Sequence, residues 1–112
     1  MAAALKPNVY YVLLALRAGP RHGLAITRDV LKFSDGEMRL WPATLYGTLQ
    51  HLSDAKWIEE IHPTDAKRRP DSSERKRYYG LTPAGRQVLD AETQRLTSLV
   101  QLARRVARKS SA

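Results

Sequence analysis

The hydrophobic pattern of this chain changes its period along the sequence, and the order of those changes limits the fold more than any other feature. Apolar residues recur at helical spacing in three successive segments, two strand-like segments then flank a polar loop, and one long helical segment follows. A helix repeats its apolar face about every 3.6 residues and a strand every second residue. Without repeats or a linker, the 112 residues are expected to form one compact domain, mainly α with a small β-hairpin.

The first two helices are expected to begin at Pro7 and Gly23. Proline suits the first turn of a helix, and Gly19-Pro20 ends the first segment. The first segment is more apolar than a helix with one solvated side requires, which indicates either core packing or a subunit interface. The apolar positions at helical spacing are Val9, Val12, Leu13 and Leu16 in the first helix, and Ile26, Val30 and Phe33 in the second.

The third helix carries the pattern that points to function. It is expected to start at Pro42, and its apolar stripe, which should face the core, consists of Trp41, Leu45, Leu49 and Leu52. The opposite side carries small or hydrogen-bonding residues. The second helix of a helix-turn-helix lies in the DNA major groove, and a narrow polar side fits there. Contacts with base edges or phosphates are therefore predicted for Ala43, Thr44, Gly47 and Gln50, with Gln50 suited to adenine.

Residues 57–62 and 75–81 have the composition of two strands, and the polar loop 64–74 separates them. This pattern predicts a hairpin with a long tip, which is the wing of a winged helix-turn-helix. Between residues 65 and 77 the hairpin carries six cations and three anions. Cations beside a recognition helix suit phosphates or the minor groove. The predicted contacts are Lys67, Arg68, Arg69, Arg75 and Arg77.

The last helix is expected to begin at Pro83, with Thr82 as its N-cap, and to run to about Arg108. Its apolar positions form a seam that Glu92 interrupts. One small domain offers too little surface to cover so long a helix, so a second copy of the chain is expected to cover it. The expected dimer contacts in this helix are Leu89, Leu96, Leu99, Val100, Ala103 and Val106.

The charge favours a polyanionic partner, since nineteen Lys and Arg against eleven Asp and Glu give a net charge of +8. The absence of cysteine excludes disulfides and cysteine-ligated zinc. The three histidines are scattered, and neither a phosphate-binding loop nor a nucleophile motif occurs. We therefore expect no enzyme, metal or cofactor. No secretion signal or membrane-spanning run is evident, so a cytoplasmic protein that avoids membranes is expected.

Three stretches, taken in order, carry a resemblance to a known family. His22-Gly23-Leu24-Ala25-Ile26 is similar to the start of that family's second helix, with Leu24 in place of tyrosine. Thr44-Leu45-Tyr46, followed by Leu49, Leu52 and Ile58, is similar to its recognition helix and next strand. Arg77-Tyr78-Tyr79-Gly80-Leu81-Thr82-Pro83-Ala84-Gly85 is similar to its aromatic second strand and the start of its last helix. At these spacings the chain resembles the PadR family of bacterial regulators over nearly its whole length.

The resemblance implies a winged helix-turn-helix over residues 1–82 and a dimerisation helix with a short tail over residues 83–112. It implies a sequence-specific transcriptional regulator, commonly a repressor, that binds a pseudo-palindromic operator in double-stranded DNA as a homodimer. The dimer would be clasped through the last helix and also the first, which adds Val9, Val12 and Leu13 to the expected contacts. Tyr46 is implied to lie near the DNA backbone. Small aromatic or drug-like molecules relieve some members, so a small-molecule effector is a further implication.

Two residue patterns depart from the family. Lys56 stands where the family usually has glycine at the end of the recognition helix, so Lys56 is strained if the backbone there requires a positive φ. The last helix carries no aromatic residue. Relatives that stack flat ligands between paired last helices rely on one, so that binding mode is not expected.

Two other classes of function fit the same basic domain. One is a winged-helix module for protein–protein assembly, in which the basic face meets an acidic partner. Binding that survives nuclease treatment would favour it. The other is an RNA-binding basic domain, which tighter binding to structured RNA than to duplex DNA would favour.

Overall fold

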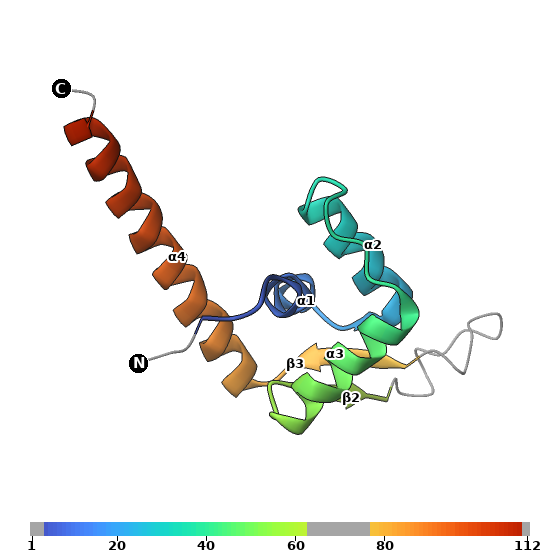
Figure 1. Cartoon of the computed structure of the whole chain (residues 1–112). Helices are drawn as coiled ribbons and strands as arrows, with labels where there is room; N and C mark the ends of the chain where they lie inside the picture. The colour runs from blue at the N-terminus through green and yellow to red at the C-terminus, as the bar shows by residue number, and fades with distance from the viewer. Residues whose placement is uncertain (1–3, 63–76, 111–112) are drawn as a thin grey trace.

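The computed structural model describes residues 4–62 and 77–110, and its elements follow the expected order (Figure 1). Four helices and a small antiparallel sheet make up these residues, which confirms the mainly helical fold with a hairpin. The elements are α1 (Pro7–Arg17), β1 (Arg21–His22), α2 (Gly23–Phe33), α3 (Pro42–Asp54), β2 (Ile58–Ile61), β3 (Tyr78–Leu81) and α4 (Pro83–Ser110).

Helix starts follow from their local sequence. Pro7 and Pro42 are the first residues of α1 and α3, where a missing N–H leaves no helical bond unmade. His22 caps α2, because its Nδ1 accepts a hydrogen bond of 3.3 Å from the N–H of Ala25. Thr82 caps α4 as the sequence predicts, since its Oγ1 accepts a bond of 3.0 Å from the N–H of Gly85.

Helix α1 lies in the middle of the molecule, against α2, α4 and β3 (Figure 1). Its apolar excess is core packing. Val12 and Leu13 are 0% exposed and Val9 is 6% exposed, all covered by their own chain. These three expected dimer contacts therefore have almost no surface left for a second copy. The rest of the core comes chiefly from Ala15, Leu16, Ile26, Val30, Leu40, Leu45, Leu49, Leu52, Ile58, Tyr79 and Leu89.

The sheet has three strands in the order β1-β3-β2, all antiparallel. In β3, Tyr78 faces His22 of β1 on one side and Ile61 of β2 on the other. The rings of His22 and Tyr78 meet edge to face at 5.5 Å, which ties the start of α2 to the sheet. Strand β1 is absent from the sequence-based expectation because two residues are too few to show alternation.

Two aromatic residues expected on core faces are exposed instead. Trp41 is 64% exposed, and the preceding residue, Leu40, takes the core position at 5%. Trp41 is the N-cap of α3 and has an extended backbone, so the helical period does not include it. Phe33 is the last residue of α2, and its side chain is 44% exposed at that end of the helix.

The end of α3 is a Schellman motif with lysine in the glycine position. The N–H of Trp57 bonds the carbonyl of Leu52, and the N–H of Lys56 bonds the carbonyl of Ser53, both at 3.0 Å. Lys56 has a φ of 65°, in the left-handed region that glycine adopts without a steric penalty. The positive φ considered from the sequence is therefore present, and Lys56 is strained.

The start of α4 packs directly on the backbone that follows α3. A Cβ built on Gly85 would overlap the carbonyl oxygen of Trp57. The same carbonyl accepts a bond of 3.1 Å from the N–H of Thr82, and the Thr82 hydroxyl donates a bond of 2.7 Å to the carbonyl of Lys56. Glycine at position 85 is thus required by close approach.

Helix α4 leaves the body of the molecule along its second half (Figure 1). Its first half packs on α1: the hydroxyls of Tyr10 and Thr93 are 2.8 Å apart, and Arg17 pairs with Asp90 at 3.3 Å. From residue 97 to residue 109 every side chain is exposed. The described chain is therefore elongated, with principal extents of 64 × 29 × 24 Å.

Replacing Lys56 with glycine is expected to stabilise the protein. A left-handed backbone costs a non-glycine residue about 1–2 kcal/mol, whereas glycine adds roughly 0.5–1 kcal/mol of unfolded-state entropy. We expect the free energy of unfolding to rise by about 0.5–1 kcal/mol in urea titrations at a fixed protein concentration. Lys56→Ala is the control that removes the same charge, and a rise equal to that of Lys56→Gly would show that charge, not backbone strain, is responsible.

Two glycine-to-alanine substitutions are expected to act in opposite directions. Alanine at position 85 would force α4 off the carbonyl of Trp57, and such overpacking lowers the free energy of unfolding by about 1–3 kcal/mol. Alanine at position 47 meets nothing within 4 Å, and removing a mid-helix glycine raises stability by about 0.5–1 kcal/mol. Thermal unfolding of both variants checks this, and a stable Gly85→Ala would contradict the close packing.

Candidate nucleic-acid interface

The outer face of α3 is open along its length. Thr44, Tyr46 and Gln50 are exposed, as are Ala43 and Gly47, so all five residues expected to contact DNA from this helix are on the surface. The inner stripe, Leu45, Leu49 and Leu52, is at most 4% exposed and fixes the rotation of the helix. Two of the outward residues are small, and space beside Gly47 is open. The small side chains at these positions therefore let the backbone of α3 approach another surface closely.

The Gln50 side chain bonds to a residue of its own helix. Its Nε2 donates a hydrogen bond of 2.9 Å to Oδ1 of Asp54, one turn along the helix. A carboxylate only accepts, so the amide nitrogen must point toward Asp54. The carboxamide oxygen and the second N–H stay available. Bidentate recognition of adenine uses one donor and one acceptor, and the held amide can still supply both.

A short chain of hydrogen bonds fixes α3 against the start of α1. Asn8 Nδ2 donates to Oγ1 of Thr48 at 3.1 Å, and that hydroxyl donates to the carbonyl of Thr44 at 2.9 Å. Thr48 is 8% exposed, so these bonds are shielded from water. The outward residue Thr44 therefore sits on a turn whose backbone is tied to a second helix.

Hollows flank α3 on both sides. A cleft of about 840 Å³ separates it from the segment before α1 and from the first turns of α4, and Thr44, His51 and Val88 are among its lining residues. A groove of about 780 Å³ separates α3 from the hairpin, lined in part by Tyr46 and Gln50. The outer face of α3 is thus a ridge with a hollow on either side.

The hairpin is described only at its base. Of the five cations expected to contact DNA there, Lys67, Arg68, Arg69 and Arg75 lie outside the described residues. Arg77 is described: its side chain is 71% exposed, and Nε lies 3.7 Å from Oε1 of Glu60. Glu59 and Glu60 are both exposed on β2. The sequence predicts a DNA contact for Arg77, and the structure adds a carboxylate beside it that the sequence pattern does not reveal.

The apolar residues of α4 fall into two groups. Leu89 is 2% exposed and belongs to the core of its own chain. Beyond it, four large apolar side chains stand open to solvent: Leu99 at 51%, Val100 at 48%, Leu102 at 47% and Val106 at 54%. Three of these are among the expected dimer contacts, together with Leu96 and Ala103, and Leu102 is an exposed apolar residue outside that expectation. Such exposure along one helix is unusual for a monomeric protein.

Glu92, which interrupts the apolar seam of α4, has a local explanation. It is 3% exposed and accepts the N–H of Leu5 at 3.1 Å. Its two oxygens also accept from Arg95, at 2.7 and 2.8 Å. The hydrogen bonds from Arg95 hold the pKa of the Glu92 carboxyl below its ordinary value. Glu92 therefore fastens the segment before α1 to α4.

Metal-binding clusters and membrane-spanning helices are both absent from residues 4–62 and 77–110. No group of three or more histidine, aspartate or glutamate side chains within these ranges is placed to hold a metal ion. None of the helices there is both long enough and apolar enough to span a bilayer.

Solved structures of transcription regulators share this arrangement. A PadR family transcription regulator from Clostridium difficile has a TM-score of 0.72 at 18% identity, covering 91% of this chain and 99% of that one. Bacillus subtilis PadR, solved in complex with operator DNA, has a TM-score of 0.62 at 23% identity and covers 77% and 46%. At these identities the likeness establishes the winged-helix fold with a long C-terminal helix.

Sequence comparison adds a family and a relative. An uncharacterised 37.1 kDa protein in transposon Tn4556 of Streptomyces fradiae is 39% identical over 88 residues, which is 79% of this chain. The chain spans only 22% of that relative's length. The family model of the PadR-like transcriptional regulators matches residues 12–91, from α1 into α4. The chain therefore belongs to the PadR-like family of transcriptional regulators, whose members are regulators and not enzymes, as the sequence predicts.

Proposed function

We propose that this protein is a transcriptional repressor that binds a pseudo-palindromic operator as a homodimer and reads its sequence with α3. The observation that carries the proposal is the outer face of α3, where every residue expected to reach DNA is exposed and the core stripe behind it is buried. Bacillus subtilis PadR, which shares this fold, was solved in complex with operator DNA, and this supports DNA as the partner here. In helix-turn-helix proteins the helix at the position of α3 lies in the major groove.

Each outward residue of α3 has a chemical role in this proposal. Ala43 and Gly47 have little or no side chain, so the backbone of α3 can approach the base edges closely. Thr44 bonds a phosphate or contacts a thymine methyl group, and Tyr46 lies against the backbone. Gln50, held by Asp54, recognises adenine. Arg77 and the hairpin cations that precede it add contacts with phosphates, which strengthen binding on any sequence.

The homodimer is proposed to form through the outer half of α4. Leu96, Leu99, Val100, Leu102, Ala103 and Val106 lie on one side of the helix at about 100° per residue, and a second α4 would cover them. Val9, Val12 and Leu13 are already buried by their own chain, so they are not part of this dimer interface. A two-fold pair would present two copies of α3, which matches an operator with two half-sites.

A small-molecule effector is proposed to bind the cleft between α3 and α4. His51 from α3 and Val88 from α4 both line this cleft, so a molecule there would contact the recognition helix and the dimer helix together. The effector proposal is tested by adding small aromatic molecules to the protein bound to a labelled operator duplex and measuring release of the duplex. Release of a mixed-sequence duplex under the same conditions is the comparison.

Gln50→Ala is expected to remove sequence preference more than affinity. A bidentate contact with adenine is worth about 1–3 kcal/mol of discrimination at each half-site. For a duplex selected from a random pool, we expect the dissociation constant to rise about tenfold or more, with little change on mixed-sequence DNA. Fluorescence anisotropy at one salt concentration measures both. Equal losses on the two duplexes would remove Gln50 from base recognition.

Leu99→Asp is expected to separate the dimer into single chains. The substitution places a charge in the centre of the apolar surface of α4, where it would be desolvated without a partner. Light scattering should then give 12.7 kDa instead of twice that mass. Gln101→Asp is the matched control, since it adds the same charge to an exposed position on the opposite side of α4. A monomeric Gln101→Asp, or a dimeric Leu99→Asp, would refute this interface.

A further inference from the structure

An exposed arginine–tryptophan pair stands just before α3, outside the face already assigned to base recognition. Trp41 is the N-cap of α3 and is 64% exposed. The guanidinium carbon of Arg39 lies 5.5 Å from the centre of its indole ring. A cation at this distance is attracted to the face of an aromatic ring, so each side chain helps to hold the orientation of the other.

Burial alternates along the segment that carries this pair. Met38 is half-buried against the core and Leu40 is buried, whereas Arg39 and Trp41 are exposed. Alternation of this kind places residues 39 and 41 on the same outward side of the chain. Within the described residues, no carboxylate pairs with Arg39. The loop is therefore anchored by its inward residues, and the outward pair contributes little to the core.

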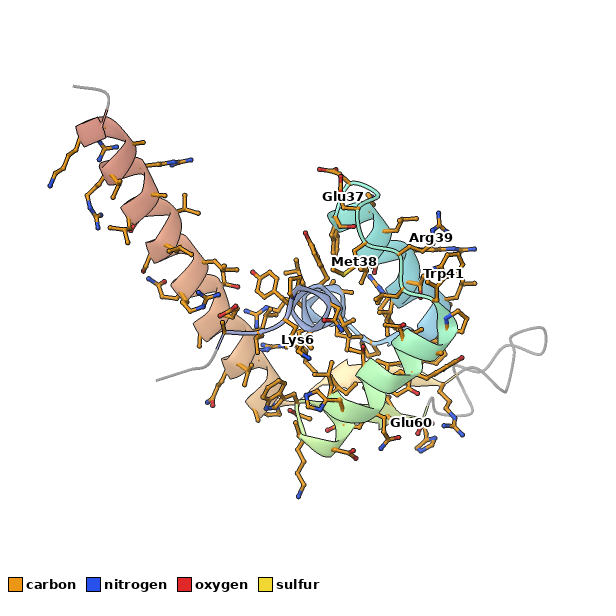
Figure 2. All side chains as sticks on the ribbon, in the orientation of Figure 1. Lys6, Glu37, Met38, Arg39, Trp41 and Glu60 are labelled. Carbon is orange, nitrogen blue, oxygen red and sulfur yellow. The ribbon has the colours of Figure 1, made fainter. Side chains whose placement is uncertain are left out.

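The pair stands at the N-terminal end of α3. Arg39 and Trp41 stand beside the first turn of α3, at the end of the molecule away from α4 (Figure 2). The major groove is about 12 Å wide, and a helix with its side chains is about 10–12 Å across. A helix that enters the groove by its N-terminal turn therefore brings the residues just before that turn against the sugar–phosphate strand.

We propose that Arg39 and Trp41 form a clamp on the DNA backbone at the edge of the groove that α3 enters. Arg39 bonds a phosphate, because its planar guanidinium can lie over the indole ring and still direct N–H groups at phosphate oxygens. Trp41 packs its exposed ring on the neighbouring deoxyribose, whose carbon atoms are apolar. This inference rests on the proposed function and adds a contact that is independent of base sequence.

The clamp is tested by the salt dependence of binding to two labelled duplexes, one selected from a random pool and one of mixed sequence. Each lost phosphate contact lowers the slope of log affinity against log salt by about one unit, so Arg39→Gln should lower it by about two units for a dimer. We expect Arg39→Gln to weaken binding to both duplexes by the same factor. Arg86→Gln is the matched control, because Arg86 is exposed on α4.

Two results would overturn the clamp and leave the proposed function standing. The first is an equal change of slope in Arg39→Gln and Arg86→Gln, since this would show an effect of total charge alone. The second is an unchanged affinity for both duplexes in Trp41→Ala and Arg39→Gln, while Gln50→Ala still loses preference. Failure of the unmodified protein to bind either duplex would instead overturn the proposed function, and the clamp with it.

Tryptophan fluorescence gives an independent readout. Of the two tryptophans, Trp41 is exposed and Trp57 is half-buried. If the Trp41 ring meets DNA, duplex addition should change the emission of the unmodified protein and should change that of Trp41→Phe much less. Because the side chain at position 41 is exposed, this variant should keep its unfolding temperature. A DNA-dependent change of full size in Trp41→Phe would place the ring away from the interface.

Discussion

The junction between α3 and α4 is the contact on which the rest of this structure depends. Thr82 bonds the carbonyl of Lys56 with its hydroxyl, bonds the carbonyl of Trp57 with its N–H, and caps α4 through Gly85. Only glycine at position 85 lets the two backbones come this close. The angle between α3 and α4 is therefore set by a few adjacent bonds. In a two-fold dimer, that angle would determine the separation of the two recognition helices.

A second set of contacts, made by α1 and the segment before it, also holds α3 and α4 in place. Asn8 and Thr48 join α1 to α3, and Glu92 joins the segment before α1 to α4. Each bond has one buried partner, Thr48 or Glu92, and a hydrogen bond in such surroundings is stronger than one in water. With α1 fixed between them, the outer face of α3 and the apolar end of α4 lie toward opposite ends of an elongated chain (Figure 1).

The helix boundaries and the polar side of α3 could be predicted from the sequence, because the patterns that indicate them are local. Proline, glycine and the cap Thr82 mark where helices begin and end, and the small polar side of α3 is visible as a pattern. Apolar spacing alone does not say what covers a face, so the pattern of the first helix leaves core packing and a subunit interface open. The family resemblance adds Val9, Val12 and Leu13 to the dimer contacts, although their own chain buries them. Trp41 fits the period of α3 but precedes the helix. The bond from Leu5 to Glu92 joins residues 87 apart, which no local pattern reveals.

The central claim is that α3 reads a two-fold operator, and selection from a random duplex pool followed by titration tests it most directly. Our account predicts enrichment of an inverted repeat with half-sites about one helical turn apart, bound by two chains per duplex. It also predicts a preference over mixed-sequence DNA of about a thousandfold or more. A pool that yields no repeat, with equal and steeply salt-dependent binding to every duplex, would contradict the claim and leave only a basic domain attracted to phosphate.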